Sequence, residues 1–393
     1  MIKTFFRNPC NIYFTLWCLY LLQGTLYASG SIISQALLAI IILISFKHYI
    51  DSISIKEKPV YFKGLNLLVL MYLIYGILLF ITDGLHTQAV FSPPTYFYLK
   101  GYMISLLPIY SCYIFARKGY LNLEMFQRWV IVFVIVAIAE YYRLEREALV
   151  AMLENREITN NMGYLFLALM PCMMLFEKRP ILQYIGMGVC VVFILMAMKR
   201  GAILIGAVAL VLFVLYKLRS AKGYQKILVS AIVVVGMVLL TRYVGNLLET
   251  SDYFNRRVQQ TMDGDASNRD IIYSTLWSAY WEDANFLQLL FGRGADGTLK
   301  VYGNYAHQDW LEALTNQGLL GIVIFFVYWL LFFKTIRSKS YCKESRFVLL
   351  LIFCVFGLKT LFSMSIGDMT IYATSILGFV LADGFDERKT VSI

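Results

Sequence analysis

The sequence predicts an all-α, polytopic membrane protein with about twelve transmembrane helices and one large loop subdomain outside the membrane. Of its 393 residues, 59% are hydrophobic and 15% are charged, and the mean hydropathy is +0.65. Soluble domains have roughly 45–50% apolar and about 25% charged residues. Nearly the whole chain consists of apolar runs of about 17 to 22 residues, enough to cross a bilayer core of about 30 Å. These features exclude disordered, collagen-like, nucleic-acid-binding and secreted disulfide-rich proteins.

Apolar runs of spanning length follow one another along the chain. The predicted spans are residues 11–28, 30–46, 62–82, 96–116, 126–144, 161–176, 180–198, 201–217, 225–243, 318–333, 346–362 and 369–382. We therefore divide the chain into residues 1–241 with the first nine spans, a large loop at 242–317, and residues 318–393 with the last three spans.

The distribution of Lys and Arg predicts the orientation. The link at residues 334–346 has five Lys or Arg in thirteen residues, whereas the loop at 83–95 has none. Short basic loops stay in the cytoplasm, so both termini are predicted to be cytoplasmic and the large loop faces the opposite side. The same rule accounts for the net charge of +10 without a nucleic-acid partner. The start, MIKTFFRNPCN, indicates a retained first helix and no cleaved signal peptide.

The large loop is the segment in which we expect chemistry. Its residues 268–284 have helical spacing of apolar side chains, and glycines mark turns after it, including Gly292, Gly297 and Gly303. A second, amphipathic helix is predicted to begin at His307 and to run directly into the tenth span at Gly318. The acidic residues of the loop, Asp309 and Glu312 among them, are predicted to be solvated.

Charged groups at three places stand out against the apolar background. Lys199 and Arg200 interrupt an apolar run, and either they form a tight turn whose side chains reach lipid phosphates or Arg200 binds an anion, with Lys199 assisting. Arg269, in the large loop, is the second such place. His307 is the third, and its imidazole is either structural or exchanges a proton near neutral pH.

Several kinds of site are missing from the sequence. HExxH, CxxC, GxxxxGK[ST] and a serine-hydrolase elbow are absent, so no metal site is predicted and an ATP-driven pump is disfavoured. The seven cysteines imply no disulfide framework.

Four sequence elements within residues 160–325 resemble, in order, the O-antigen ligases and O-antigen polymerases of bacterial surface polysaccharide assembly. They are Asn161-Met162-Gly163; Lys199-Arg200-Gly201-Ala202; Ser267-Asn268-Arg269 followed by Trp277 and Gly292-Arg293-Gly294; and His307-Gln308 followed by Leu311, Leu314, Gly318 and Gly321. Two positions depart from the family pattern, because Lys199 stands in place of the usual serine and Gln308 in place of the usual asparagine.

The resemblance implies a GT-C-like membrane glycosyltransferase of the bacterial inner membrane. It would transfer glycan from an undecaprenyl-pyrophosphate-linked donor to an acceptor hydroxyl on another sugar, at the periplasmic face. His307 would be the general base, while Arg200 and Arg269, with Lys199, would bind the pyrophosphate. No metal and no cofactor is required, and direct displacement would invert the anomeric carbon. A chain-length regulator and a flippase are the partner proteins that the resemblance suggests.

Three further assignments stay open from the sequence. Trp277, Trp281, Trp310 and Gln308 are candidates for contact with the glycan acceptor, although packing accounts for most aromatic residues of such a chain. The acceptor is another lipid-linked repeat chain in a polymerase, which we favour, or a lipid A core or other anchor in a ligase. A polysaccharide-lipid transporter is the alternative from another class, but it predicts internal repeats that the sequence does not have.

Overall fold

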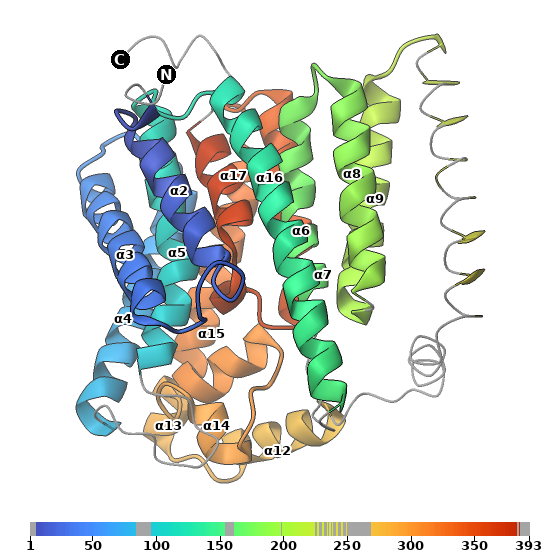
Figure 1. The fold of residues 1–393 in the computed structure, drawn as a ribbon. Helices are drawn as coiled ribbons and strands as arrows, with labels where there is room; N and C mark the ends of the chain where they lie inside the picture. The colour runs from blue at the N-terminus through green and yellow to red at the C-terminus, as the bar shows by residue number, and fades with distance from the viewer. Residues whose placement is uncertain are drawn as a thin grey trace.

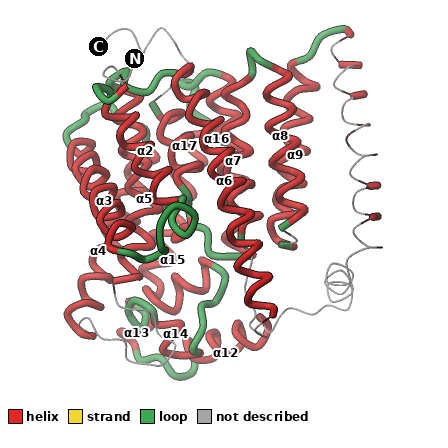
Figure 2. The backbone as a smooth tube through the Cα atoms, viewed as in Figure 1, coloured by secondary structure: helices red, strands yellow, loops and turns green. Residues whose placement is uncertain are grey.

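The computed structural model describes residues 5–83, 96–153, 161–197, 199–224, scattered positions from 226 to 249, 269–382 and 385. These residues form helices joined by loops, without a β-strand (Figure 2). Six of the helices are long and apolar enough to cross a membrane, and three shorter apolar helices accompany them. The predicted class, a polytopic all-α membrane protein, is confirmed.

The helices largely coincide with the predicted spans. In order they are α2 (Pro9–Leu21), α3 (Ile32–Ile53), α4 (Tyr61–Asp83), α5 (Tyr96–Arg117), α6 (Leu123–Leu153), α7 (Met162–Leu169), the 3-10 helix η1 (Met170–Phe176), α8 (Pro180–Met196), α9 (Arg200–Ser220), α12 (Arg269–Trp281), α13 (Phe286–Phe291), α14 (Gly297–Tyr302), α15 (Asp309–Ile336), α16 (Lys343–Phe362), the 3-10 turn η2 (Ile366–Asp368) and α17 (Ile371–Leu381).

Two predicted spans differ from this order of helices. The first was expected over residues 11–28, but α2 ends at Leu21 because the chain turns at Gly24, which has a φ of 81°. The ninth, at residues 225–243, falls mostly outside the described residues. Within the predicted large loop, residues 251–268 also lie outside them, and with them Ser267 and Asn268.

The basic loops and the large loop lie at opposite ends of the bundle (Figure 1). We call the end formed by residues 54–60, 117–122, 177–179, 221–224 and 337–342 the basic end. The other, which carries α12, α13 and α14, we call the loop end. This arrangement agrees with the alternating direction that the predicted spans require.

The centre of the bundle is α17, which is buried along its whole length. A helix that is apolar on all sides belongs either in a protein interior or in a membrane span, and the complete burial of α17 places it in the interior of the bundle. It packs closely on α5, since a Cβ built on Gly378 would lie 2.5 Å from the carbonyl oxygen of Ile109 and 2.8 Å from the Cβ of Cys112. Glycine is therefore required at this crossing.

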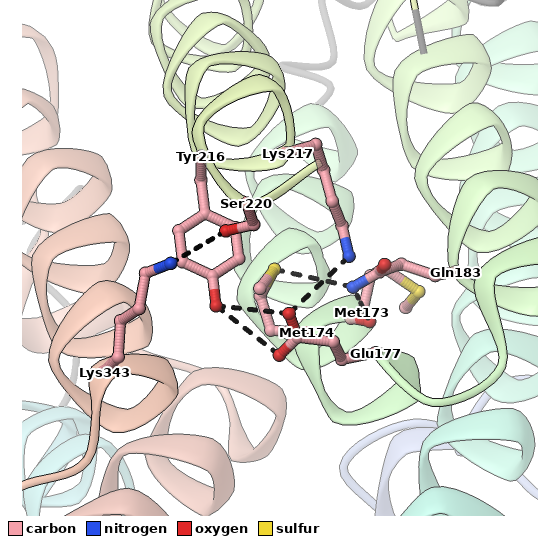
Figure 3. A network of polar contacts seen from close by, with 8 residues as sticks. All are labelled: Met173, Met174, Glu177, Gln183, Tyr216, Lys217, Ser220 and Lys343. Atoms are coloured by element: carbon pink, nitrogen blue, oxygen red, sulfur yellow. Dashed lines mark hydrogen bonds and ion pairs between the residues drawn. The ribbon is translucent and has the colours of Figure 1, made fainter. Parts of the chain in front are cut away.

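A polar network joins three helices at the basic end (Figure 3). Tyr216 Oη donates to Glu177 Oε1 at 3.2 Å, and Lys217 Nζ lies 3.9 Å from the same oxygen. Lys343 Nζ, at the start of α16, donates to Ser220 Oγ at 2.9 Å. These contacts fix the last turn of α9, the helix whose first residue, at the other end, is Arg200.

Candidate active site

His307 lies in a turn at the loop end, immediately before α15. The helix begins at Asp309, with Gln308 as its N-cap, so the prediction that His307 begins the helix is wrong. The reason is the backbone of His307, whose φ of 54° is left-handed and cannot belong to an α-helix. Non-glycine residues are found in this region when surrounding contacts hold them there, and such residues are frequent at functional sites.

The buried carboxylate of Glu312 holds the turn that contains His307. Its Oε1 accepts a hydrogen bond from the backbone N–H of Ala306 at 2.6 Å. Its Oε2 accepts from Thr298 Oγ1 at 2.8 Å and from Asn316 Nδ2 at 3.0 Å. The side chain therefore ties α14 and α15 to the peptide that precedes His307.

A second buried carboxylate, Asp309, ties α15 to the loop after α16. Its Oδ2 accepts from the backbone N–H groups of Ser365 at 2.6 Å and Ile366 at 3.2 Å. Asp309 is 4% exposed and Glu312 is 3% exposed, so the prediction that both are solvated is wrong. Spacing in the sequence cannot reveal this, because the partners of both carboxylates come largely from other segments of the chain.

Two predicted cations lie close enough to His307 to act on its proton affinity. Burial lowers the pKa of His307 below its ordinary value, and the charges of Arg269 and Lys199 lower it further. Both cations oppose a third positive charge on the imidazole. The lowered pKa favours the neutral imidazole, the form that can accept a proton.

The turn that contains Lys199 and Arg200 is linked to Arg269 through Phe362, which both contact. Arg269 Nη1 donates to the carbonyl oxygen of Phe362 at 2.9 Å, and a Cβ built on Gly201 would lie 3.4 Å from the Cβ of Phe362. The first turn of α9 thus packs against the residue that Arg269 binds. Arg200, as the first residue of α9, lies at this junction.

A lysine that the sequence did not assign to the site also lies here. Lys359, in α16 one turn before Phe362, is 2% exposed and forms a 2.7 Å ion pair with Asp368. Its Nζ is 4.6 Å from the ring centroid of Tyr164. The sequence does carry a signal for it, because an ionisable residue inside an apolar span is a candidate functional residue.

A groove rich in tryptophan, which we call the tryptophan groove, begins at Gln308, the residue after His307. It has a volume of about 610 Å³ and runs between α12 and α15. Its lining includes Trp277, Trp281, Gln308 and Trp310, so the structure brings together the four residues that the sequence proposed for glycan contact. Trp277 is 54% exposed, whereas Trp310 Nε1 is bound to Thr360 Oγ1 at 3.0 Å.

The glycines of the large loop permit close approach of backbones. Gly318, with a φ of 65°, breaks α15, so the amphipathic segment does not run straight into the span as predicted. A Cβ built there would lie 2.5 Å from the backbone nitrogen of Gly292. The break frees the carbonyls of Thr315 and Asn316, which accept from Arg293 N at 2.9 Å and Gly294 N at 3.0 Å.

The comparison with protein families bears on this same region. Residues 185–326 match the family model of O-antigen ligase. The match includes Lys199, Arg200, Arg269, His307 and the broken helix at Gly318. No curated protein matches the chain. The family match confirms the predicted resemblance to O-antigen ligases and polymerases over this part of the chain.

Proposed function

We propose that the protein is a membrane glycosyltransferase that joins lipid-linked oligosaccharide repeats into a polysaccharide, with His307 as its general base. One observation carries the proposal: burial and the charges of Arg269 and Lys199 lower the pKa of His307, whose neighbour Gln308 lines a groove rich in tryptophan. A neutral imidazole accepts a proton, the cations attract a phosphorylated donor, and tryptophan faces stack on sugars.

The reaction would proceed by direct displacement. His307 takes the proton of the acceptor hydroxyl while the oxygen of that hydroxyl attacks the anomeric carbon of the donor glycan. The bond between that carbon and the pyrophosphate oxygen breaks, and the electron pair leaves on the pyrophosphate. Arg200 and Arg269, with Lys199, stabilise the charge that develops there. Attack from the face opposite the leaving group inverts the anomeric configuration.

The donor in this proposal is an undecaprenyl-pyrophosphate-linked oligosaccharide in the inner membrane of a bacterium. The loop end then faces the periplasm and both termini face the cytoplasm, in agreement with the positive charge of the short loops at the basic end. The acceptor is a second lipid-linked chain. A ligase would differ only in the acceptor, which would be a lipid A core or another anchor. A chain-length regulator and a flippase are the proposed partner proteins.

The test is the size profile of surface glycan on a denaturing gel from a deletion strain complemented with variants. For a polymerase, deletion leaves anchors that carry a single repeat, and wild type restores the ladder. Bare anchors with accumulated lipid-linked chains would identify a ligase instead. An unchanged profile after deletion would contradict both enzyme functions.

His307→Ala tests the general base in the same strain. We expect the ladder to be lost at a normal protein level on immunoblots, because proton transfer by a positioned base contributes about 100- to 10,000-fold in rate. His48→Ala is the matched control, since His48 lies in α3 and binds Ser111 at 3.1 Å, away from the proposed chemistry. A normal ladder with His307→Ala would refute the assignment of the base.

A further inference from the structure

A large pocket opens at the basic end, opposite the proposed active site. It lies between the ends of α4, α5, α15 and α17 and has a volume of about 1250 Å³. Nothing in the proposed transfer reaction uses it, and its lining does not overlap the tryptophan groove. We call it the basic pocket.

The lining of the basic pocket is strongly positive. Four cations, Lys58, Arg117, Lys334 and Arg337, line it together with one carboxylate, Glu57. Arg117 Nη1 donates to the carbonyl oxygen of Glu57 at 2.6 Å. Lys58 Nζ donates to backbone carbonyls of the segment that ends α3, at 3.2 Å and 3.4 Å. These acceptors are neutral, so they hold the two cations in place without cancelling their charge.

One wall of the basic pocket continues the surface that faces lipid. Leu330 and Phe333 line it from α15 and are 52% and 42% exposed. Exposed apolar side chains of a spanning helix lie against acyl chains once the protein is in a bilayer. Arg337 lies at the boundary, with its guanidinium carbon 5.8 Å from the ring centroid of Phe333. The pocket thus combines cations with an apolar wall that opens sideways.

We propose that the basic pocket binds one anionic phospholipid, its headgroup phosphate between Lys58, Arg117, Lys334 and Arg337 and its acyl chains along Leu330 and Phe333. A soluble anion would need the cations alone, whereas the lipid-facing wall fits a ligand that is anionic at one end and apolar at the other. Basic pockets between transmembrane helices at the cytoplasmic surface are known to take such headgroups. The inference is independent of the proposed transferase reaction.

The test uses the purified full-length protein in neutral detergent. Phosphatidylglycerol, phosphatidylcholine of the same acyl chains and inorganic phosphate are titrated, and bound lipid is counted by native mass spectrometry while thermal unfolding is followed. We expect one tightly held phosphatidylglycerol per chain and a raised midpoint of unfolding. Phosphatidylcholine and inorganic phosphate should give neither.

The double variant Lys334→Gln/Arg337→Gln removes two cations whose side chains are exposed, so the fold should persist. We expect its affinity for phosphatidylglycerol to fall roughly 30-fold, since the two lost cations together contribute about 2 kcal/mol near an anionic lipid. The matched control is Arg219→Gln/Lys226→Gln, which removes the same charge from exposed positions outside the basic pocket.

The outcomes separate the pocket from a general effect of charge. Equal weakening in both double variants would mean that the whole basic end attracts anionic lipid, and it would overturn the proposal. Equal stabilisation by phosphatidylcholine, or by inorganic phosphate, would overturn it as well. Retained tight binding in the control together with loss in the pocket variant would support it.

Discussion

At the scale of single residues, the proposed site depends on positively charged side chains near His307 and on the buried carboxyl group of Glu312. Burial, Arg269 and Lys199 lower the pKa of His307, and Glu312 binds the backbone N–H of Ala306 just before it. The cations could be selected from the sequence, because positive charge is unexpected in an outer loop. Glu312 could not, because an acidic residue near the start of a helix is ordinary. Only its 3% exposure and its three hydrogen-bond donors reveal its role.

The pH dependence of transfer should report the charge of Lys199. A general base works when it is unprotonated, and the pKa of His307 lies below its ordinary value because of burial, Arg269 and Lys199. Activity should therefore persist into mildly acidic solution and fall as pH drops through this lowered pKa. Lys199→Gln removes one opposing charge and should move the acidic limb of kcat/KM to higher pH. Lys300→Gln is the control, and an identical shift in both would contradict the direct effect.

Loss of the Glu312 carboxylate should disturb both stability and catalysis. Glu312→Ala leaves three donors without their acceptor, which costs about 1–3 kcal/mol for each buried group left unpaired, so the midpoint of thermal unfolding should fall clearly. Glu282→Ala, at an exposed position of the loop end, should change it little. Glu312→Gln keeps one acceptor oxygen, so its midpoint of unfolding should lie between those of Glu312→Ala and Glu282→Ala. A wild-type midpoint for Glu312→Ala would refute this role of Glu312.

At the scale of elements, helices were predictable and their interruptions were not. Long apolar runs specify α4, α5 and α16 closely, because a spanning helix needs about 20 apolar residues and little else. The end of α2 at Leu21 and the break of α15 at Gly318 were not predicted, since both depend on local backbone conformation that apolar periodicity does not report.

The break at Gly318 provides a direct comparison of two glycines. Gly318 and Gly303 both have positive φ, at 65° and 80°, but only Gly318 has backbone atoms where a Cβ would lie. Gly303→Ala should therefore lower the free energy of unfolding only by the cost of a positive φ for alanine, about 1–2 kcal/mol. Gly318→Ala must also separate α15 from Gly292, so we expect much less folded protein and no glycan ladder. Fluorescence-detected size exclusion measures the amount of folded protein. Equal amounts for Gly318→Ala and Gly303→Ala would contradict the close packing at Gly318.

At the scale of the whole molecule, the two ends carry different charges and different cavities. The basic pocket lies at the basic end, whereas His307, Arg269 and the tryptophan groove lie at the loop end, which carries α12, α13 and α14 in Figure 1. If the short basic loops are cytoplasmic, the proposed chemistry takes place across the bilayer from the proposed phospholipid site.

Cysteine labelling tests this orientation. Asn304→Cys places a thiol on an exposed residue of the loop end, and Ser340→Cys places one at the basic end. In spheroplasts, a membrane-impermeant maleimide should label the first variant and spare both the second and the wild type. Permeabilised membranes should label both variants. The reverse pattern would place the loop end in the cytoplasm and would invert the assigned topology.

The sequence by itself predicted the membrane class and most helix positions, because apolar length is a local property of a chain. It also singled out the cations and the histidine that we propose for the site, because a charge within an apolar run is visible locally. An ordered set of short motifs indicated the resemblance to O-antigen ligases, with which the family match over residues 185–326 agrees. The tertiary structure alone decided that Glu312 and Asp309 are buried, that Lys359 joins the site, and that Trp277, Gln308 and Trp310 share a groove. These facts depend on contacts between α12, α14, α15 and α16, and no pattern within one segment records which other segment will pack against it.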